Sequence, residues 1–386
     1  TIITILCEGK MIYFDNASTT QISGRALKVY NEISKTCFYN SSSLHKGGVL
    51  AKTKLEKARQ DILNCINGQV GDRLIFCSGA TEANNMALFG LTRKNQSILV
   101  SVGEHPSVYN TAMSLLQRGN EVDFVKLNSE GTVDIDDFTQ KICNKKYDLV
   151  SIMLTNNETG AINDIRSLCE IAKRANPQCV FHSDCVQAFC KIDVLVDNLG
   201  IDSISLSAHK INGPKGIGAL YVKKGVGFNP IVYGGGQENN LRSGTENLPA
   251  ICAFAEAAIE KCEVLKSNFE NAARIRETIL RRFDDKGFEY EVNGSKRGSP
   301  YVLSISLDGV KGEVLVHKLE MDDIYIGTGS ACSSKSSDNR ILSAMRKEKG
   351  KILGNIRLSF SANNTIDEAE IVAEKIIQYA TELRNL

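Results

Sequence analysis

Short apolar runs alternate with amphipathic stretches between about residues 70 and 225 of this 386-residue chain. Most runs are continuously apolar, which is typical of strands buried on both faces of a largely parallel sheet. They predict strands at 73–79, 97–102, 121–127, 149–155, 180–184, 203–208 and 216–224, with helices between them such as 81–94 and 165–175. The last two strands are too close for a crossover helix, so we expect that pair to be antiparallel. The alternation predicts an α/β fold with a doubly wound, mostly parallel seven-stranded sheet.

The last third of the chain has a different pattern, which predicts a smaller α+β domain. A long helical connection is expected first, at 251–285. Strands at 299–307 and 355–361 and a helix at 312–320 follow. The final segment has apolar residues near helical spacing behind a capping-box pattern, Thr365 with Glu368.

Two domains are therefore expected. The large domain is predicted over 16–255, and the small domain is predicted from 11–15 together with 256–386. Residues 1–10 precede the first well-patterned segment, which starts at Met11, and are interpreted as an extension outside both domains.

Composition narrows the classes of function. A net charge of +1 gives no bulk attraction to nucleic acid or to an anionic membrane surface. No apolar run approaches the roughly 18 residues of a membrane span, and residues 1–10 lack the basic region and cleavage site of a signal peptide. The 12 cysteines form neither a CxxC pair nor a cluster at zinc spacing. Scattered cysteines of this kind are typical of reduced thiols, so we expect a cytoplasmic protein without a metal site.

Four sequence features together suggest a site for an aldehyde cofactor such as pyridoxal 5'-phosphate (PLP). Lys210 follows a buried-looking strand, where a lysine of lowered pKa can attack an aldehyde. Asp184 ends another strand and offers the anion that keeps a pyridine nitrogen protonated. The small-residue turn at 78–81 precedes a helix, whose free N–H groups suit a phosphate, and His105 offers a ring for stacking. Taken singly, each has an ordinary interpretation: an exposed lysine, a helix cap, a turn or a loop histidine.

Ten motifs in order give these features a family context. They are YFDNASTT, NSSSLHKGG, CSGATEANN, GEHPSV, TNNETG, SDCVQ, SAHKINGPKG, RSGTEN, GTGSACSS and IRLSFS. From Met11 onward the chain resembles the PLP-dependent cysteine desulfurases of the NifS/IscS type, in the class V aminotransferase-like family. The resemblance implies PLP fold type I, with a large PLP-binding domain and a small domain that carries the catalytic cysteine loop.

The resemblance also implies a reaction and its partners. L-cysteine would become L-alanine, with the sulfur left on Cys332 as a persulfide for an acceptor protein in iron–sulfur cluster assembly or thio-modification. The alternative is a selenocysteine lyase or another class V PLP lyase or aminotransferase. Cys332 favours a desulfurase, because an ordinary aminotransferase needs no mobile thiol.

Site roles follow from the resemblance residue by residue. Lys210, Cys332 and His105 would be catalytic, as the Schiff-base lysine, the sulfur acceptor and a stacking proton carrier. Asp184 would pair with the ring nitrogen. The other expected contacts are Gln187 to the phenolic oxygen, Ala80, Thr81, Ser207 and His209 to the phosphate together with Thr245 of a second subunit, and Asn157 and Arg357 to the substrate carboxylate. The role of Thr245 implies a homodimer with shared active sites.

Four positions depart from the family pattern. Ser41 stands where proline is usual, and Ser361 replaces a glycine close to Arg357. Cys77 and Cys185 replace small residues beside the predicted phosphate turn and Asp184. None of these changes removes a predicted catalytic group. The long span between Cys332 and Arg357 favours the group of members whose long loop delivers sulfur to scaffold or carrier proteins.

Overall fold

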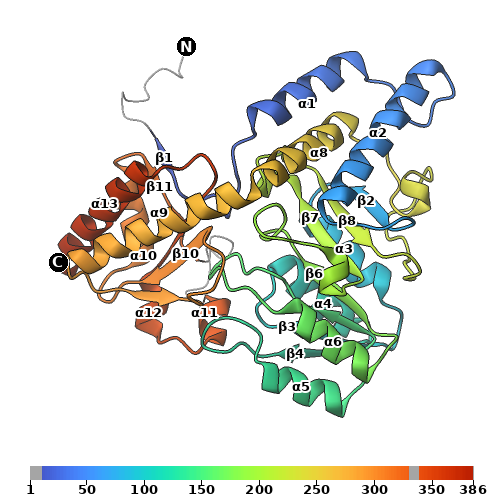
Figure 1. Ribbon diagram of the computed structural model, residues 1–386. Helices are drawn as coiled ribbons and strands as arrows, with labels where there is room; N and C mark the ends of the chain where they lie inside the picture. The colour runs from blue at the N-terminus through green and yellow to red at the C-terminus, as the bar shows by residue number, and fades with distance from the viewer. Residues whose placement is uncertain (1–10, 330–338, 386) are drawn as a thin grey trace.

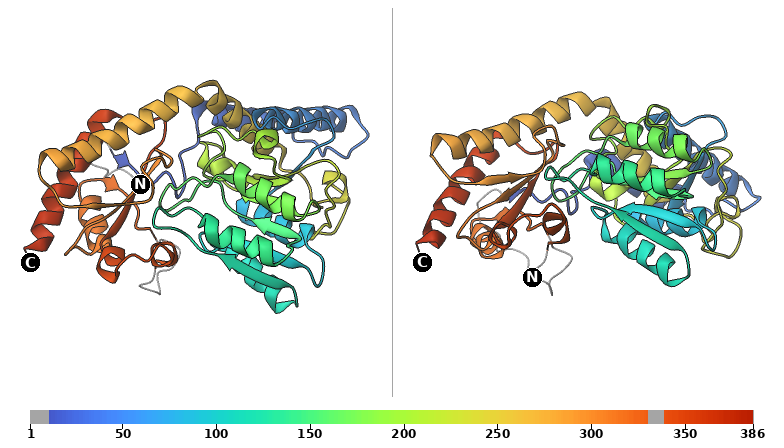
Figure 2. Two further views of the ribbon diagram at one scale, coloured as in Figure 1. Left: turned by 60° about the horizontal axis from the view of Figure 1, so that its bottom comes forward. Right: turned by 90° about the horizontal axis from the view of Figure 1, so that it is seen from below.

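The computed structural model describes residues 11–329 and 339–385. Cys332 and the expected extension at 1–10 therefore lie outside the described residues. The described chain contains a seven-stranded sheet, a three-stranded sheet and a two-stranded pair. The two larger sheets lie in separate halves of the molecule, and α9 (Leu265–Asp285) extends from the boundary between them along the smaller half in Figures 1 and 2.

The seven-stranded sheet confirms the predicted fold class. Its strands are β2 (Arg73–Cys77), β3 (Ser97–Ser101), β4 (Glu121–Val125), β5 (Leu149–Ser151), β6 (Val180–Asp184), β7 (Ser203–Ser207) and β8 (Gly218–Val222). Their order is β2-β8-β7-β6-β5-β3-β4. The five strands from β7 to β4 are parallel, whereas β8 is antiparallel to both of its neighbours. The predicted antiparallel pairing of the last two strands is thereby confirmed.

Both faces of this sheet are covered, as the continuous apolar runs predicted. In β2, Leu74 and Phe76 join one buried cluster, whereas Ile75 and Cys77 join another. The second cluster includes helices α3 (Ala80–Leu91) and α4 (Pro106–Gln117). The first includes α1 (Gly24–Thr36), α2 (Lys46–Cys65), α5 (Ile135–Asn144), α6 (Ile165–Ala175) and α8 (Leu248–Glu263). Figure 1 shows α1, α2 and α8 side by side at one end of this half.

The smaller half has a core of its own. Its antiparallel sheet has the order β12-β10-β9, and β1 pairs in parallel with β11. The elements are β1 (Ile12–Tyr13), β9 (Glu291–Asn293), β10 (Val302–Ser306), α10 (Gly312–Glu320), β11 (Ile324–Tyr325), α11 (Arg340–Ala344), α12 (Lys349–Leu353), β12 (Asn355–Ser359) and α13 (Ile366–Arg384). Phe14 meets Phe360 edge to face at 5.1 Å, so the N-terminal segment packs in the C-terminal core. The capping box of Thr365 and Glu368 is confirmed at the start of α13.

The predicted helical connection is interrupted at one residue. Val264 has φ −123° and ψ 21°, which separates α8 from α9. Apolar periodicity continues through this point, so the pattern alone could not reveal the break. The division into domains at 255/256 stays a prediction; it falls inside α8, where Ala253 and Ala257 both pack in the core of the large sheet. Among the described residues, no helix is long and apolar enough to cross a bilayer.

Candidate active site

The predicted lysine and aspartate lie at one edge of the large sheet. β6 and β7 are parallel neighbours, so Asp184 and Ser207 end their strands on the same side. Lys210 follows β7 in a single 3₁₀ turn. Its Nζ lies 2.5 Å from the carbonyl oxygen of Ala17 and 2.6 Å from that of Ser18. The N-terminal loop 15–20 therefore closes this edge of the sheet.

A polar chain joins Asp184 to His105. Asn84 Nδ2 donates to Asp184 Oδ2 at 2.7 Å and to Ser107 Oγ at 2.8 Å. Ser107 Oγ in turn lies 2.7 Å from His105 Nδ1. All four side chains are buried or nearly so. The anion expected at a pyridine nitrogen and the ring expected to stack on it are thus positioned by the same network.

The surroundings of His105 fix its tautomer. The main-chain N–H of Ser107 donates to His105 Nδ1 at 3.1 Å. A main-chain N–H can only donate, so Nδ1 accepts and the neutral ring carries its proton on Nε2. Burial lowers the pKa of His105, and the charges of Lys210 and Arg340 act in the same direction while Asp184 opposes them. His105 is therefore held neutral near pH 7, with one N–H to offer.

The strand register brings the predicted phosphate contacts together. Gly218 of β8 pairs with Cys77 on one side and with Ser207 on the other. The turn at Gly79 and the end of β7 are thus one strand apart. A Cβ at Gly218 would lie 2.8 Å from two backbone atoms of Gly79, so the close approach requires glycine here. Ala80 begins α3 directly after this turn.

These residues fit the phosphate end of PLP. The N-cap of α3, Gly79, has no side-chain cap within the described chain, which leaves the first N–H groups of the helix, at Ala80 and Thr81, available to an anion. Ser207 Oγ is buried and has no hydrogen-bond partner among the described residues, which is unusual for a polar atom in a core. His209 Nδ1 lies 3.1 Å from Thr19 Oγ1, and burial lowers the pKa of His209 to about 4. A phosphate would satisfy the orphaned hydroxyl and the helix N–H groups together.

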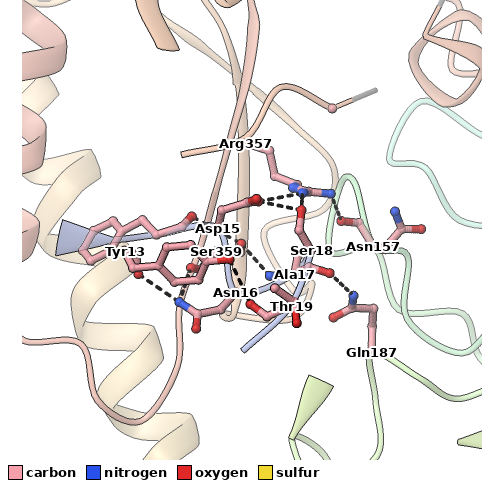
Figure 3. Close-up of polar contacts among 12 residues, drawn as sticks. Tyr13, Asp15, Asn16, Ala17, Ser18, Thr19, Asn157, Gln187, Arg357 and Ser359 are labelled. Carbon is pink, nitrogen blue, oxygen red and sulfur yellow. Dashed lines mark hydrogen bonds and ion pairs between the residues drawn. The ribbon is translucent and has the colours of Figure 1, made fainter. Parts of the chain in front are cut away.

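Gln187 reaches the same loop as Lys210. Its Nε2 donates to the carbonyl oxygen of Ala17 at 2.9 Å, as Figure 3 shows. Its Oε1 accepts from Lys191 Nζ at 2.8 Å. Burial lowers the pKa of Lys191 to about 7, and nearby cations add to this effect. The amide predicted to contact a phenolic oxygen is therefore anchored at both of its ends.

Arg357 forms a second centre opposite the large sheet. Its Nη2 donates to Asp15 Oδ1 at 2.8 Å and to Ser18 Oγ at 2.7 Å (Figure 3). Its Nη1 donates to the main-chain oxygen of Asn157 at 3.1 Å. Its Nε is buried without a hydrogen-bond partner in the described part of the chain. The guanidinium thus keeps an open donor, as a carboxylate-binding arginine requires.

Asn157, which was predicted to bind the substrate carboxylate, contacts Arg357 through its main chain. Its main-chain carbonyl, not its side-chain amide, contacts Arg357. The amide forms no hydrogen bond within 11–329 and 339–385. Asn157 lies beside the guanidinium as expected, and its proposed contact with a carboxylate stays a prediction.

The described residues on either side of 330–338 lie next to Arg357. Gly327 exchanges two backbone hydrogen bonds with Arg357, at 2.9 and 2.7 Å. A Cβ at Gly329 would lie 2.6 Å from Asn339 Nδ2, so the two ends of the gap meet. Arg340 donates to main-chain oxygens of the turn before α4, including that of Glu104. Gly329 and Asn339, the described residues that flank 330–338, therefore lie in the same region as Arg357.

A buried carboxyl lies where these ends meet. Burial raises the pKa of Glu158 to about 7, while a hydrogen bond from Asn339 and the charges of Arg357 and Arg340 oppose the shift. Burial likewise raises the pKa of Glu104, whose Oε1 accepts from the N–H of Met153 at 2.7 Å. Both groups are protonated more readily than an exposed glutamate, which reduces the negative charge that Glu158 places beside Arg357 and that Glu104 places beside Arg340.

Thr245 is the predicted residue that the structure leaves apart. Its side chain is exposed, and no hydrogen bond from it reaches the other candidate residues in the described chain. Arg242, three residues earlier, pairs with Glu82 of α3 at 2.8 Å, which ties this segment to the helix behind the phosphate turn. The role of Thr245 in a second copy of the chain stays a prediction.

The four residues that depart from the family pattern have ordinary surroundings in the structure. Ser41 Oγ donates to Glu246 at 2.9 Å, and the N–H of Ser361 donates to Asn364 rather than contacting Arg357. Burial raises the pKa of Cys77 to about 12 and that of Cys185 further. These two thiols are therefore poor nucleophiles, which separates them from the proposed role of Cys332.

Sequence reasoning missed several residues of the site. Asn84 and Ser107 connect Asp184 to His105, and Asp15 and Ser18 hold Arg357. Ala17 contributes only a main-chain oxygen, which leaves no trace in side-chain chemistry. The available signal was the run of short polar residues after β1, which has neither helical nor strand periodicity.

Comparison with known proteins gives the same family as the sequence motifs. The Aminotransferase class-V family model matches residues 12–372. The NifS/IcsS protein homolog of Lactobacillus delbrueckii subsp. bulgaricus is 39% identical, covering 97% of this chain and 100% of its own length. The cysteine desulfurase IscS of Dictyoglomus turgidum is 36% identical, covering 95% of each chain. A solved NifS-like protein has a TM-score of 0.89 at 31% identity, covering 97% of this chain and 100% of its own. The chain belongs to the class V aminotransferase family and, within it, to the NifS- and IscS-like cysteine desulfurases.

Proposed function

We propose that this protein is a PLP-dependent cysteine desulfurase that converts L-cysteine to L-alanine and holds the released sulfur on Cys332 as a persulfide. One observation carries the proposal. Loop 15–20 binds the amine of Lys210 through two carbonyl oxygens and the guanidinium of Arg357 through Asp15 and Ser18. A lysine for the cofactor and an arginine for an amino-acid carboxylate are therefore fixed to the same six residues.

The residues around this loop have separate proposed roles in the reaction. When bound, PLP supplies an electron sink for the carbon that carries the substrate amine. Lys210 Nζ would attach the cofactor and then accept the proton of that carbon. Arg357 would orient the substrate through its carboxylate, with the N–H groups that the protein leaves unpaired in the described chain. His105 would offer its Nε2–H as a proton donor.

The reaction needs no external oxidant. The Cβ–S bond of L-cysteine breaks, and a bond forms between that sulfur and Cys332 Sγ. The Cβ atom gains a proton, and the thiol of Cys332 becomes a persulfide, so one thiol and L-cysteine give L-alanine and one persulfide. Cys332 must react as a thiolate. Its position three residues after Gly329 supports it as the acceptor, because Gly329 lies against Asn355 in the strand that carries Arg357.

We further propose a homodimer in which Thr245 completes the phosphate site of the second copy. Large apolar side chains are exposed in the segment before α2 and near Thr245: Phe38 at 72%, Leu44 at 99% and Tyr233 at 81%. A monomer rarely exposes such residues close together without a partner. The contact of Ser41 with Glu246 places these two segments side by side. The proposed dimer acts in the reducing cytoplasm, which suits the free thiols of the ten described cysteines.

Peptide mass spectrometry after a brief exposure to L-cysteine tests the function. We expect one additional sulfur on the peptide that contains Cys332, and stoichiometric L-alanine. The Cys332→Ser variant should still bind PLP but release little alanine. Sulfur spread evenly over the peptides of Cys77 and Cys185 would contradict a single acceptor. A protein that shows no visible cofactor absorption would contradict the proposed chemistry itself.

A further inference from the structure

A second lysine lies behind Gln187. Lys191 follows it by four residues, and only 7% of Lys191 is exposed. The charged groups that act on Lys191 include three cations, Lys210, Lys261 and Arg357. A buried amine among cations is unfavourable for folding unless it has a compensating role. The single hydrogen bond that its side chain makes in the described chain, 2.8 Å from Nζ to Gln187 Oε1, indicates what that role is.

The two contacts of Gln187 enforce one orientation of its amide. Lys191 Nζ donates to Oε1, and Nε2 donates to the carbonyl oxygen of Ala17 at 2.9 Å. The carbonyl of Ala17 only accepts, so a flipped amide would lose that hydrogen bond whether Lys191 is charged or neutral, and a protonated Lys191 would lose its acceptor as well. The oxygen of Ala17 also accepts from Lys210 Nζ at 2.5 Å. The Nε2 group therefore faces the reactive lysine, with a second N–H available.

We propose that Lys191 is a positioning residue that holds the amide of Gln187 with its N–H groups toward the phenolic oxygen of PLP. This inference rests on the proposed function, because it takes PLP as the cofactor and Gln187 as the donor to that oxygen. A donor at the phenolic oxygen stabilises its ionised form and lowers the proton affinity of the bound cofactor. An amide free to turn would present its own oxygen there for part of the time, and that benefit would be lost.

The test uses Lys191→Met in the full-length protein loaded with PLP. Methionine is similar in length but cannot donate to Gln187. The pH titration of the visible absorption should shift its midpoint upward by about one unit, as expected for losing one hydrogen bond to a charged group. The free energy of unfolding of the cofactor-free variant should be unchanged or higher, because an unfavourable buried amine is removed. A merely structural lysine would give the opposite result: lower stability and an unshifted midpoint.

Two controls separate orientation from simple charge. Lys261 lines the same small cavity and also acts on Lys191 as a cation, so Lys261→Met removes a nearby charge without touching Gln187. Its midpoint should match that of the wild type. In a Gln187→Leu background, Lys191→Met should cause no additional shift. An equal shift in Lys261→Met, an additive shift in the double variant, or failure of Lys191→Met to fold would each overturn the proposal. A wild-type protein without visible absorption would instead refute the proposed function.

Discussion

Replacing Arg357 by lysine isolates what the guanidinium contributes to substrate binding. Its side chain is 5% exposed, so its hydrogen bonds form away from bulk water. Nη2 donates to Asp15 and Ser18 and Nη1 donates to the oxygen of Asn157, which leaves the Nε–H and the second N–H of Nη1 without a partner among the described residues. Lysine keeps the charge but not the fork, so the substrate carboxylate loses one charged hydrogen bond. Such a bond contributes about 1.5–3 kcal/mol, which corresponds to roughly a 10- to 150-fold loss in kcat/KM.

The assay is the initial rate of alanine formation over a range of L-cysteine concentrations. We expect most of the loss to appear as a higher KM, since the carboxylate is bound throughout the reaction. The visible absorption of the cofactor should be unchanged, because Arg357 binds the side chains of Asp15 and Ser18, whereas Lys210 binds the main-chain oxygens of Ala17 and Ser18. Arg282→Lys is the matched control, since Arg282 makes surface ion pairs with Glu370 and Glu374.

Two results would refute this reasoning. A kcat/KM within threefold of the wild type would show that the carboxylate binds elsewhere. Loss of cofactor absorption in Arg357→Lys would show that Arg357 organises the cofactor end of the site rather than the substrate end. In either case the open Nε would need another explanation.

Three further changes test other parts of the site. Lys210→Ala should remove cofactor-dependent sulfide release, and turnover in that variant would exclude the proposed lysine. Gly218→Ala should push the turn at Gly79 away from β7 and weaken PLP binding at least tenfold, measured by equilibrium dialysis, since the added Cβ lies 2.8 Å from that turn. Burial lowers the pKa of His182 to about 3, whereas an unfolded histidine titrates near 6.5. The unfolded state therefore binds the proton first, and stability is lost as pH falls from about 6.5 toward 3. In His182→Gln, the unfolding free energy should fall less steeply with decreasing pH, by up to about 1.4 kcal/mol per unit; an identical slope would contradict this assignment.

The strands were predictable because burial on both faces leaves continuous apolar runs. The residues at which the strands end were less predictable. The predicted strand 149–155 ends its ladder at Ser151, yet Ile152 and Leu154 remain buried and donate their N–H groups to the oxygens of His182 and Asp184. Burial and backbone hydrogen bonds to β6 therefore both continue past the last residue assigned to β5, and a hydrophobic pattern cannot locate that boundary.

The site was predictable where its chemistry is in side chains at strand ends. Lys210 and Asp184 follow apolar runs, and the parallel topology brings such ends together. The sequence did not identify Asn84 as a site residue, because an asparagine inside a helix has the same sequence pattern whether its side chain joins a buried hydrogen-bond network or faces water. The carbonyl of Ala17 is main-chain chemistry, which every residue has, and only the folded path of loop 15–20 gives it a role.

The meeting of Gly329 with Asn339 has a consequence for how this protein could be modified. A segment that starts and finishes at one point can be lengthened, shortened or exchanged without moving its supports. Doubling the length of such a loop costs only about 0.6 kcal/mol in closure entropy. A sequence from a relative placed between Gly329 and Asn339 should therefore leave the contacts of Gly329 with Asn355 and of Arg340 with Glu104 in place.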